Sequence, residues 1–361
     1  MFDVAIIGAG LAGLSCAQQL HQAGYSVIVV EKSRGVGGRV ATRRLHDTCA
    51  DHGVRYLEAQ GKRSKQLISR LEARSILQVW TDTIYNLKTN SELGSLDSGS
   101  NIPRYVAPEG MTAIAKYLAV GLEIWLNRRV SSLTPTADST WNLTLEPQLE
   151  LQNELQVKAV VMAIPAPQAL MLLEPLALNF LTTGFLDNLR SVEFDPCLSV
   201  MAGYPVQRQE ELEQLNPAWK ACTLQDSDLA WIGLDSSKRK SPQMPIFVLQ
   251  SSAEFAKLHL DTEDLNSVGQ LLLSRAAQLL IPWLDTPDWF QVHRWRYAFP
   301  SHYLNKEYLN AKTPIPLICC GDWCGGNLIE NAIVSGLAAA EKINDKLQQR
   351  NLPGGKFLEA I

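Results

Sequence analysis

No run of apolar residues in this 361-residue sequence is long enough for a membrane helix. Such a helix needs about 20 consecutive apolar residues, and the best candidate, residues 160–166, is interrupted by Pro165. The first positive charge is Lys32, so the basic start of a signal peptide is missing and we expect no such peptide. An excess of one charge is also missing, since 33 Lys and Arg residues face 37 Asp and Glu residues. We therefore expect a cytoplasmic protein with neither a membrane nor a nucleic acid as an obligate partner.

The cysteines lack the pattern of a disulfide framework. They are odd in number and two are adjacent: Cys16, Cys49, Cys197, Cys222, Cys319, Cys320 and Cys324. We interpret them as reduced thiols. Cys320 and Cys324 have neither C-x2-C spacing nor a neighbouring histidine, so we predict no metal site. The composition is 46% hydrophobic and 19% charged, which allows a substantial core.

The N-terminus carries the pattern of a strand, a glycine-rich turn, a helix and a second strand. The turn, G-A-G-L-A-G, directly follows the strand predicted at residues 3–7. Gly8 permits the tight turn, and Gly10 lets the backbone approach a pyrophosphate beside the Leu11 N–H at the helix start. Gly13 allows the helix to pack closely on the strand. The alternative is a glycine-rich turn in an unrelated α/β protein.

An acidic residue stands where a ribose-binding carboxylate is required. Glu31 ends the second strand, 18 residues after Gly13, and can accept hydrogen bonds from both ribose hydroxyls. Because it would repel a 2′-phosphate, the adenosine bound here is that of FAD or NAD and not of NADP. The basic segment that follows contains Gly38, and Arg39 can pair with a phosphate through two hydrogen bonds. We assign Lys32, Gly38 and Arg39 to the cofactor site; the alternative is a solvated basic loop.

The rest of the chain alternates between predicted strands and helices. A three-stranded meander is expected at residues 124–130, 141–145 and 157–163, and an exposed turn at residues 92–101. Helices are expected at residues 62–73, 110–118, 176–189, 261–280 and 330–349, and the segment 353–361 looks like an appended tail. This order predicts one nucleotide-binding domain built from both ends of the chain, with a second domain inserted between its pieces.

Six short segments connect the chain to a known family. They are KSRGVGGR (32–39), DHGVRY (51–56), PEGM (108–111), AIPAPQ (163–168), HRWRY (293–297) and CGDWC (320–324). In these segments the sequence resembles the flavin-containing amine oxidase superfamily, and more narrowly its renalase-like members. The resemblance implies an α/β fold with a FAD-binding Rossmann-type domain and an inserted α+β substrate domain, in the topology of amine oxidases and p-hydroxybenzoate hydroxylase. It assigns residues 1–60, 102–167 and 290–350 to the FAD-binding domain, 61–101 and 168–289 to the substrate domain, and 351–361 to a tail.

The resemblance also implies noncovalently bound FAD and adds residues to its site. Val130 would meet the adenine through backbone groups, and Gly321 and Asp322 would lie at the ribityl or pyrophosphate region. Ile329 would bring the N–H of the last helix near the flavin C2 carbonyl, where a helix N-terminus stabilises the anion of the reduced ring. For Asp322, the alternative is a turn cap.

The segments 51–56 and 293–297 are expected to lie at the flavin ring. Val54 and Arg55 would pass beside the ring. The aromatic side chains of Tyr56, Trp295 and Tyr297 would frame a flat substrate stacked on it. The alternative for these aromatics is an ordinary place in the core.

Two positions depart from the renalase-like relatives. Arg55 stands where the relatives carry glutamine, and His52 stands where they carry methionine. A cation at residue 55 favours an anionic substrate or stabilises reduced flavin. His52 is either a buried histidine with its hydrogen bonds satisfied or a functional residue.

A single nucleotide fingerprint indicates that electrons come from a substrate docked directly on the flavin. The renalase-like reaction oxidises dihydronicotinamide isomers, α-NAD(P)H or the 2- or 6-dihydro forms, by hydride transfer to flavin N5, and O2 then yields H2O2. This reaction needs placement of the donor and no enzyme base. Two alternatives remain open: a flavin amine oxidase or desaturase acting on another small substrate, and a flavin-binding protein without turnover.

Overall fold

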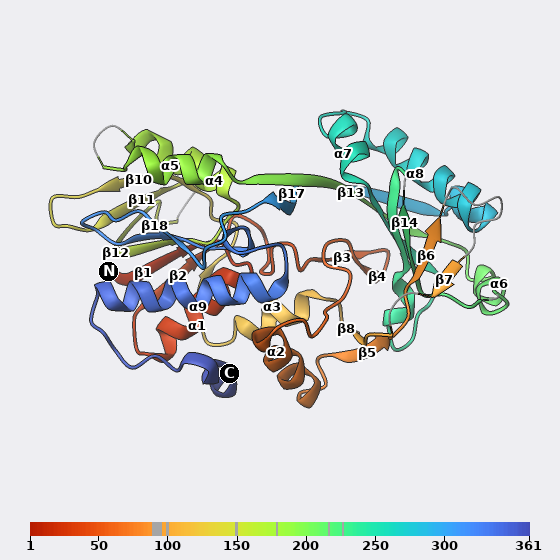
Figure 1. Ribbon diagram of the computed structural model, residues 1–361, viewed down its shortest axis with the longest axis horizontal. Helices are drawn as coiled ribbons and strands as arrows, with labels where there is room; N and C mark the ends of the chain where they lie inside the picture. The colour runs from red at the N-terminus through yellow and green to blue at the C-terminus, as the bar shows by residue number, and fades with distance from the viewer. Residues whose placement is uncertain (89–95, 99–100, 149–150, 178–179, 216, 226) are drawn as a thin grey trace.

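Two β-sheets lie side by side in the computed structural model, and helices cover both of them (Figure 1). The structure describes residues 1–88, 96–98, 101–148, 151–177, 180–215, 217–225 and 227–361. Both ends of the chain lie with the first sheet (Figure 1). Most of the exposed turn expected at residues 92–101 falls outside the described residues.

The first sheet joins parallel strands to an antiparallel meander. Its described strands are β1 (Phe2–Ile7), β2 (Val27–Val30), β9 (Glu123–Trp125), β10 (Val130–Pro135), β11 (Trp141–Leu145), β12 (Glu154–Met162), β18 (Leu309–Asn310) and β19 (Leu317–Cys319). β1 lies between β2 and β12 and is parallel to both, with Val4 opposite Val27 and Ala159. β9 pairs parallel with β2, and β10 and β11 form the meander with β12.

Helices cover both faces of this sheet, as its parallel part requires. One side carries α1 (Leu11–Gln22), α2 (Lys62–Ala73), α3 (Thr112–Leu118) and α9 (Ile329–Lys346), and the other carries α4 (Ala166–Leu173) and α5 (Thr183–Arg190). Val4 and Ile6 of β1 pack toward the first set, and Ala5 and Ile7 pack toward the second. The predicted domain boundary at residue 168 assigns most of α4 and all of α5 to the substrate domain, yet both helices share the core of the first sheet.

The second sheet is mostly antiparallel. In sheet order, its described strands are β17 (Trp289–His302), β13 (Glu193–Gly203), β16 (Ile246–Ser251), β15 (Leu229–Leu234), β14 (Ala221–Gln225), β6 (Tyr85–Lys88) and β7 (Leu96–Ser98). Its helices are α6 (Arg208–Glu213), α7 (Ala253–His259) and α8 (Leu265–Leu279). Val200 and Leu249 face the core shared with α8, whereas Met201 and Val248 face the opposite way, into the core that contains the first sheet. The second face is therefore turned toward the nucleotide-binding segments.

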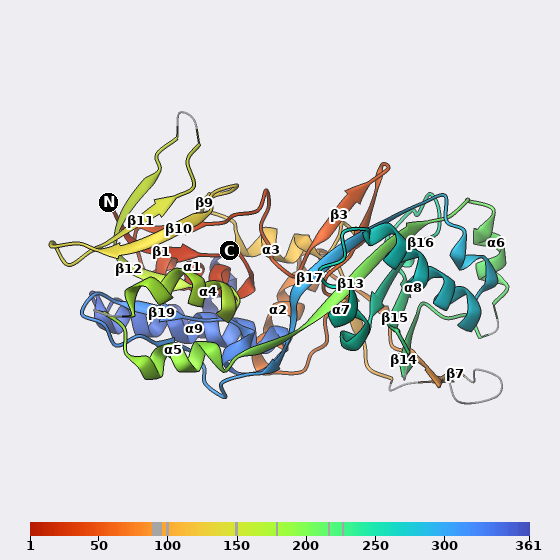
Figure 2. The same ribbon diagram turned by 90° about the horizontal axis from the view of Figure 1, so that it is seen from above.

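The strands β13 and β17 run from the first part of the molecule into the second (Figures 1 and 2). They pair antiparallel from Gly203 opposite Trp289 to Glu193 opposite His302. Two small sheets lie nearby: β3 (Thr42–Leu45) with β4 (Thr48–Asp51), and β5 (Gln78–Thr81) with β8 (Arg104–Val106). These elements bring residues distant in sequence to one junction.

The first strand of the predicted meander is wrong. The strand expected at residues 124–130 is divided between β9, which joins the parallel sheet, and β10, which begins at Val130. Asn127 lies between them with φ 55°, a left-handed conformation that interrupts an extended chain. The run therefore supplies two strands to the same sheet.

Two other segments also differ from expectation. The helix expected at residues 176–189 begins only at α5, because the side chain of Thr182 accepts a hydrogen bond from Phe185 N and caps the helix there. The C-terminal segment forms a 3-10 helix, η5 (Gly354–Ala360), and buries Phe357 and Leu358 in the first core. It is a packed part of the fold.

Among the described residues, no helix combines the length and the apolar character that a membrane crossing requires.

Candidate functional site

The glycine-rich turn connects β1 to α1 in a conformation that requires glycine. Gly8 has φ 106°, and a Cβ atom there would lie 2.5 Å from the carbonyl oxygen of Ala163. A Cβ atom on Gly13 would lie 2.1 Å from the carbonyl oxygen of Gly8. At Gly10 an added Cβ would meet no atom within 4 Å, and α1 begins at the next residue, Leu11. The turn thus combines tight packing on one side with an open approach to a helix N-terminus on the other.

Glu31 follows the end of β2 and is only 7% exposed. Its Oε2 accepts a hydrogen bond from Ala9 N at 2.8 Å, and its Oε1 accepts one from Ser33 N at 2.8 Å. These bonds fix the carboxylate beside the glycine-rich turn. Two carboxylate oxygens can accept about four hydrogen bonds in total, so capacity remains for two ribose hydroxyls.

Val130 and Lys32 both lie close to Glu31. Val130 begins β10 two residues after Arg128, whose backbone N donates to Glu31 O at 2.8 Å. Lys32 extends toward α4, where its Nζ lies 3.3 Å from Gln168 Oε1. Burial, followed by repulsion from Arg129, lowers the pKa of Lys32. The structure therefore places both residues close to Glu31, and their contact with the adenosine stays a prediction.

Arg39 connects three parts of the chain. The segment before it is held against the glycine-rich turn, because Gly37 N donates to Ala9 O at 2.8 Å, and Gly38 lies over Gly10. The Arg39 guanidinium donates from Nη2 to Asp322 Oδ1 at 2.6 Å and from Nη1 to the carbonyl oxygen of Ala298, in β17, at 3.1 Å. Each terminal nitrogen keeps one further N–H for a phosphate.

The CGDWC segment forms a tight turn, η4 (Asp322–Cys324). Gly321 N donates to Ser335 Oγ at 2.9 Å, and Asp322 Oδ1 accepts from Trp323 N at 2.9 Å. Asp322 is thus a turn cap, the alternative given for it above, and it also pairs with Arg39; its contact with FAD stays a prediction. The helix α9 begins shortly afterwards at Ile329, and the first N–H groups of a helix have no partner within it.

The segment 51–56 passes between Arg39 and the second sheet. Gly53 packs so closely that an added Cβ would lie 2.0 Å from Arg39 O, and Val54 N donates to the same oxygen at 2.9 Å. Arg55 turns to the second sheet, where its Nε donates to Gln250 Oε1 at 2.6 Å. Its guanidinium carbon lies 5.0 Å from the ring centroid of Trp231. Burial lowers the pKa of Arg55, yet a guanidinium remains charged at neutral pH.

The three aromatic residues predicted to frame the substrate make separate contacts. Trp295 and Tyr297 are both half-buried on β17. The pairing of β17 with β13 shifts register between Trp295 and Phe299, and the Tyr297 ring contacts that of Phe194 at 5.6 Å. Trp295 Nε1 donates to His52 O at 2.8 Å, and its ring stacks on the ring of His52 at 5.3 Å. Tyr56 makes its ring contacts with Trp80 at 6.4 Å and with the guanidinium of Arg104 at 5.8 Å.

Two histidines lie beside Trp295, and both are neutral at physiological pH. Burial, then His293 and Arg43, lowers the pKa of His52 to about 3. Burial, then Arg43, lowers the pKa of His293 to about 4. Arg43 Nη2 lies 3.3 Å from His293 Nδ1, which makes that nitrogen the acceptor and leaves the proton on Nε2. His293 was missed as a site residue, although it stands two positions before Trp295 and therefore on the same strand face.

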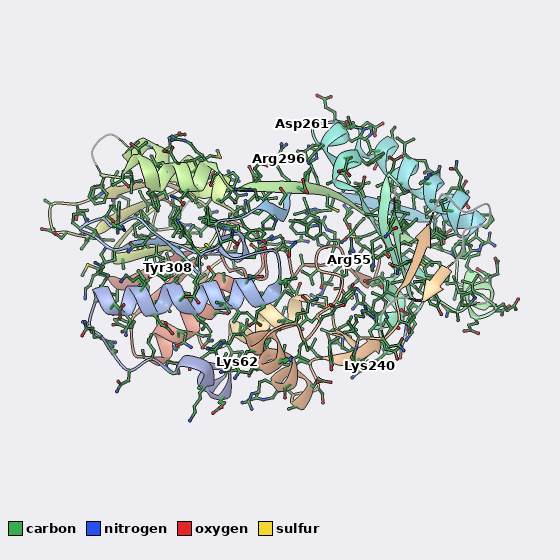
Figure 3. The ribbon with its side chains drawn as sticks, in the orientation of Figure 1. Arg55, Lys62, Lys240, Asp261, Arg296 and Tyr308 are labelled. Carbon is green, nitrogen blue, oxygen red and sulfur yellow. The ribbon has the colours of Figure 1, made fainter. Side chains whose placement is uncertain are left out.

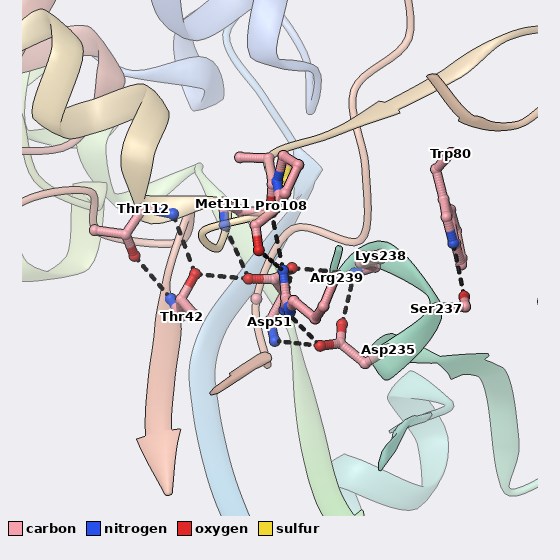
Figure 4. A network of polar contacts seen from close by, with 12 residues as sticks. Thr42, Asp51, Trp80, Pro108, Met111, Thr112, Asp235, Ser237, Lys238 and Arg239 are labelled. Atoms are coloured by element: carbon pink, nitrogen blue, oxygen red, sulfur yellow. Dashed lines mark hydrogen bonds and ion pairs between the residues drawn. The ribbon is translucent and has the colours of Figure 1, made fainter. Parts of the chain in front are cut away.

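A buried network of four charges ties this region to the second sheet (Figure 4). Asp51, directly before His52, is bound by Lys238 Nζ at 3.3 Å and by Arg239 Nη2 at 2.9 Å. Asp235 is bound by the same two cations at 2.7 and 2.6 Å. Burial alone would raise the pKa of Asp51, but Lys238 and Arg239 outweigh it and lower the pKa. The run SSKRK (residues 236–240) has the composition of an exposed loop, and nothing in it predicts that Lys238 is buried.

The comparisons with known proteins agree with this geometry. Residues 6–71 match the family described as NAD(P)-binding Rossmann-like domain, and residues 84–344 match the family described as flavin containing amine oxidoreductase. This chain belongs to the flavin containing amine oxidoreductase family.

The curated relatives resemble only a small part of this family member. An L-amino-acid oxidase of Crotalus adamanteus is 41% identical over 71 residues, which are 20% of this chain and 14% of that protein. A probable flavin-containing monoamine oxidase A of Dictyostelium discoideum is 33% identical over 78 residues, 22% of this chain and 17% of that protein. The match thus spans less than a fifth of either relative.

Solved structures match over almost the whole chain. A putrescine oxidase bound to putrescine superposes with a TM-score of 0.70 at 14% identity, covering 95% of this chain and 99% of that one. Cyclohexylamine oxidase from Brevibacterium oxydans gives a TM-score of 0.69 at 14% identity, covering 96% and 99%. These likenesses establish the fold: a mixed α/β amine oxidase fold with a Rossmann-like domain.

The family makes the chain a FAD-dependent oxidoreductase, and the residues present fit FAD. The approach at Gly10 is open to a pyrophosphate, the Glu31 carboxylate is held with acceptor capacity left over, and Arg39 offers further N–H groups. The flavin, when bound, supplies the hydride-accepting N5. The chain itself contributes position: Arg39, Asp322 and Val54 hold one another by hydrogen bonds.

Proposed function

We propose that this chain oxidises dihydronicotinamide isomers, α-NAD(P)H or the 2- or 6-dihydro forms, in the renalase-like manner. The donor gives up a hydride, which carries two electrons and one proton, and becomes an aromatic pyridinium. O2 receives these two electrons and this proton together with a second proton from water, and becomes H2O2. The observation that carries the proposal is the position of Trp295, which lies against two neutral histidines on β17, the strand that accepts a hydrogen bond from Arg39.

The placement of Trp295 supports a flat substrate. Its indole is fixed by the bond from Nε1 to His52 O and by stacking on the His52 ring. A fixed aromatic wall orients a stacked heterocycle, and orientation is the main contribution that hydride transfer requires from the protein. Ala298, three residues further along the strand, accepts a hydrogen bond from Arg39. The aromatic wall therefore lies on the strand to which Arg39 is hydrogen-bonded.

The ionisation of the nearby groups supports a reaction without proton removal. His52 and His293 have pKa values lowered to about 3 and about 4, so both are weak bases at pH 7. A dihydronicotinamide needs no base, since its oxidised ring is aromatic. The nearby cations Arg43 and Arg55 favour a donor that carries phosphates.

Amine oxidation is the second candidate, and the family itself favours it. The solved structures that share the fold include a putrescine oxidase and a cyclohexylamine oxidase. Arg43 and Arg55 weigh against it, because a protonated amine is repelled by cations within a few ångströms. The third candidate is a flavin-binding protein without turnover. It differs from both enzymes because no substrate would reduce its flavin.

We also propose that FAD is bound noncovalently. Cys324 lies two positions after Asp322, and it is fully buried. Burial raises the pKa of Cys324 to about 12, so the nucleophilic thiolate is scarce. Acid precipitation should release all the flavin into the supernatant; yellow protein in the pellet would contradict this. The seven unpaired thiols support a reducing compartment such as the cytoplasm.

Steady-state turnover tests the proposed reaction. Purified holoprotein is mixed with α-NADH, 6-dihydro-NAD or benzylamine in air, and oxygen consumption and H2O2 are recorded. We expect stoichiometric H2O2 and NAD⁺ from a dihydronicotinamide isomer and no turnover of benzylamine. H2O2 from benzylamine alone would favour the amine oxidase, and no H2O2 from any donor would favour the binding protein.

A further inference from the structure

We infer that the substrate carries an oxyanion, a carboxylate or a phosphate, and that the guanidinium of Arg55 binds it, held in place by Gln250. The inference deepens the proposed function and rests on it for the location of the substrate. Arg55 is then a specificity-determining residue, and Gln250 is a positioning residue. Arg55 lies at the junction between the two sheets (Figure 3).

A row of side chains crosses the second sheet beneath Arg55. Ser199 is opposite His293 on one side and opposite Gln250 on the other, and Gln250 is opposite Trp231. Directly opposed residues of neighbouring strands point to the same face of a sheet. The four residues therefore form one line on the face that is turned toward the segment 51–56.

Gln250 fixes both Arg55 and the backbone that precedes it. Its Oε1 accepts from Arg55 Nε at 2.6 Å, and its Nε2 donates to Gly53 O at 2.8 Å. The side chain of Gln250 is 2% exposed, so this clamp is sheltered from water. The Trp231 ring stabilises the guanidinium through a cation–π contact, in which the guanidinium carbon lies 5.0 Å from the ring centroid. The cation is thus held in one orientation before any ligand arrives.

The charge of Arg55 has no acidic partner among the described residues, and its terminal nitrogens have no hydrogen bond there. Two other sheltered arginines behave differently. Arg104 pairs with Glu58 at 3.1 Å, and Arg239 pairs with two aspartates. A sheltered charge without a counter-ion is costly. An arginine that is clamped and left unpaired is therefore suited to an anionic ligand, which its planar fork binds through two hydrogen bonds.

Two further polar atoms of the row point to the same conclusion. Ser199 Oγ and Trp231 Nε1 are buried and have no hydrogen-bond partner within the described part of the chain. Indole N–H is a donor only, and a hydroxyl group donates as well as accepts. Unused donors in line with an unpaired guanidinium favour an oxyanion over a cation.

Matched ligands of different charge test the inference without turnover. Holoprotein is titrated with nicotinate, nicotinamide and nicotinamide mononucleotide, and binding is followed by calorimetry and by the flavin absorbance. Nicotinate carries a carboxylate, the mononucleotide carries a phosphate, and nicotinamide carries neither. We expect one of the two anions to bind at least about tenfold more tightly than nicotinamide, and the tighter one identifies the oxyanion.

Variants assign the preference to Arg55. Arg55→Gln should abolish the preference for the anion while nicotinamide binds as before. Gln250→Glu should also abolish it, because a carboxylate beside Arg55 Nε neutralises the guanidinium while Arg55 stays present. Arg44→Gln removes an equal charge from the exposed side of β3 and should keep the preference.

Equal affinities for the three ligands in the parent protein would overturn the inference. So would a preference that survives in Arg55→Gln. If Arg55→Gln shifted the flavin reduction potential but left the anion preference intact, Arg55 would serve the flavin and the inference would also be overturned. If the anion preference depends on Arg55 but no dihydronicotinamide isomer is oxidised, the inference stands and the proposed reaction fails.

Discussion

Arg39 Nη2 and Asp322 Oδ1 lie 2.6 Å apart, although the two residues are separated by 283 positions in the sequence. The pair joins the basic segment after β2 to the turn before α9. Asp322 is buried and Arg39 is partly exposed, so the ion pair is sheltered on one side only. Its consequence is that Arg39, the arginine predicted to bind a phosphate, is aligned by the C-terminal part of the chain.

Removal of Arg39 should therefore reduce FAD content. Arg39→Ala should be purified mostly as apoprotein, and Arg39→Lys should restore part of the content, since an ammonium group offers no planar fork. Asp322→Asn should lower FAD affinity less than Arg39→Ala. The flavin-to-protein absorbance ratio checks all three variants, and an Arg39→Ala protein with full flavin content would show that Arg39 is a solvated surface residue.

Glu31→Ala should weaken FAD binding and leave the reaction of bound FAD almost unchanged. Each charge-assisted hydrogen bond lost from the ribose should cost about 1.5–3 kcal/mol at most. FAD affinity is measured by fluorescence quenching, and the reduction rate is measured at saturating FAD. Glu123→Ala, at an exposed glutamate of β9, is the control and should bind FAD normally. Normal affinity combined with lost turnover in Glu31→Ala would show that Glu31 acts at the chemistry.

Lys238→Met should destabilise the protein strongly. It leaves Asp51 and Asp235 with one cation in place of two, and loss of one partner from a buried ionic network costs about 3–5 kcal/mol. Urea unfolding measures the loss, and Lys240→Met, at an exposed lysine two positions away, should change stability by less than about 0.5 kcal/mol. Similar unfolding midpoints for the two variants would show that the network contributes little.

The same network predicts how stability depends on acid. The pKa of Asp51 is lowered in the folded protein, so its contribution is full above the ordinary aspartate pKa of about 4 and is lost as the pH falls through the folded value. Asp51→Asn should therefore reduce stability at pH 7 and flatten the stability curve below about pH 4. A curve that stays parallel to that of the parent would contradict the lowered pKa.

Local patterns of the sequence predicted the strand, turn and helix around the glycine-rich segment well. The strand, turn and helix around Gly8 and Gly13 depend on residues close in sequence, and β1 and α1 form where expected. The hydrogen bonds that complete the site join residues far apart in the sequence, such as Arg55 and Gln250, and no local pattern predicts such a pairing. For the same reason the burial of Lys238 could not be predicted, because it depends on the position of Asp51 in the folded chain.

Trp295→Ala should slow reduction of the flavin and leave FAD content intact. The ring positions the donor, and a donor misplaced by about 1 Å loses on the order of a hundredfold in rate. Trp295→Phe keeps an aromatic ring but loses the hydrogen bond to His52 O, so its reduction rate should lie between those of the parent protein and Trp295→Ala. Anaerobic stopped-flow absorbance measures the rates. Unchanged reduction in Trp295→Ala would place the substrate elsewhere.

The central claim is hydride transfer without an enzyme base, and the pH dependence of anaerobic flavin reduction tests it most directly. Holoprotein is mixed with α-NADH or 6-dihydro-NAD between about pH 5.5 and 8, and the flavin absorbance is followed. His52 and His293 stay neutral over this range, because their pKa values lie at about 3 and about 4. The account predicts a rate that is nearly constant with pH. A rate that climbs steeply with pH, or reduction by benzylamine and by no dihydronicotinamide isomer, would contradict it.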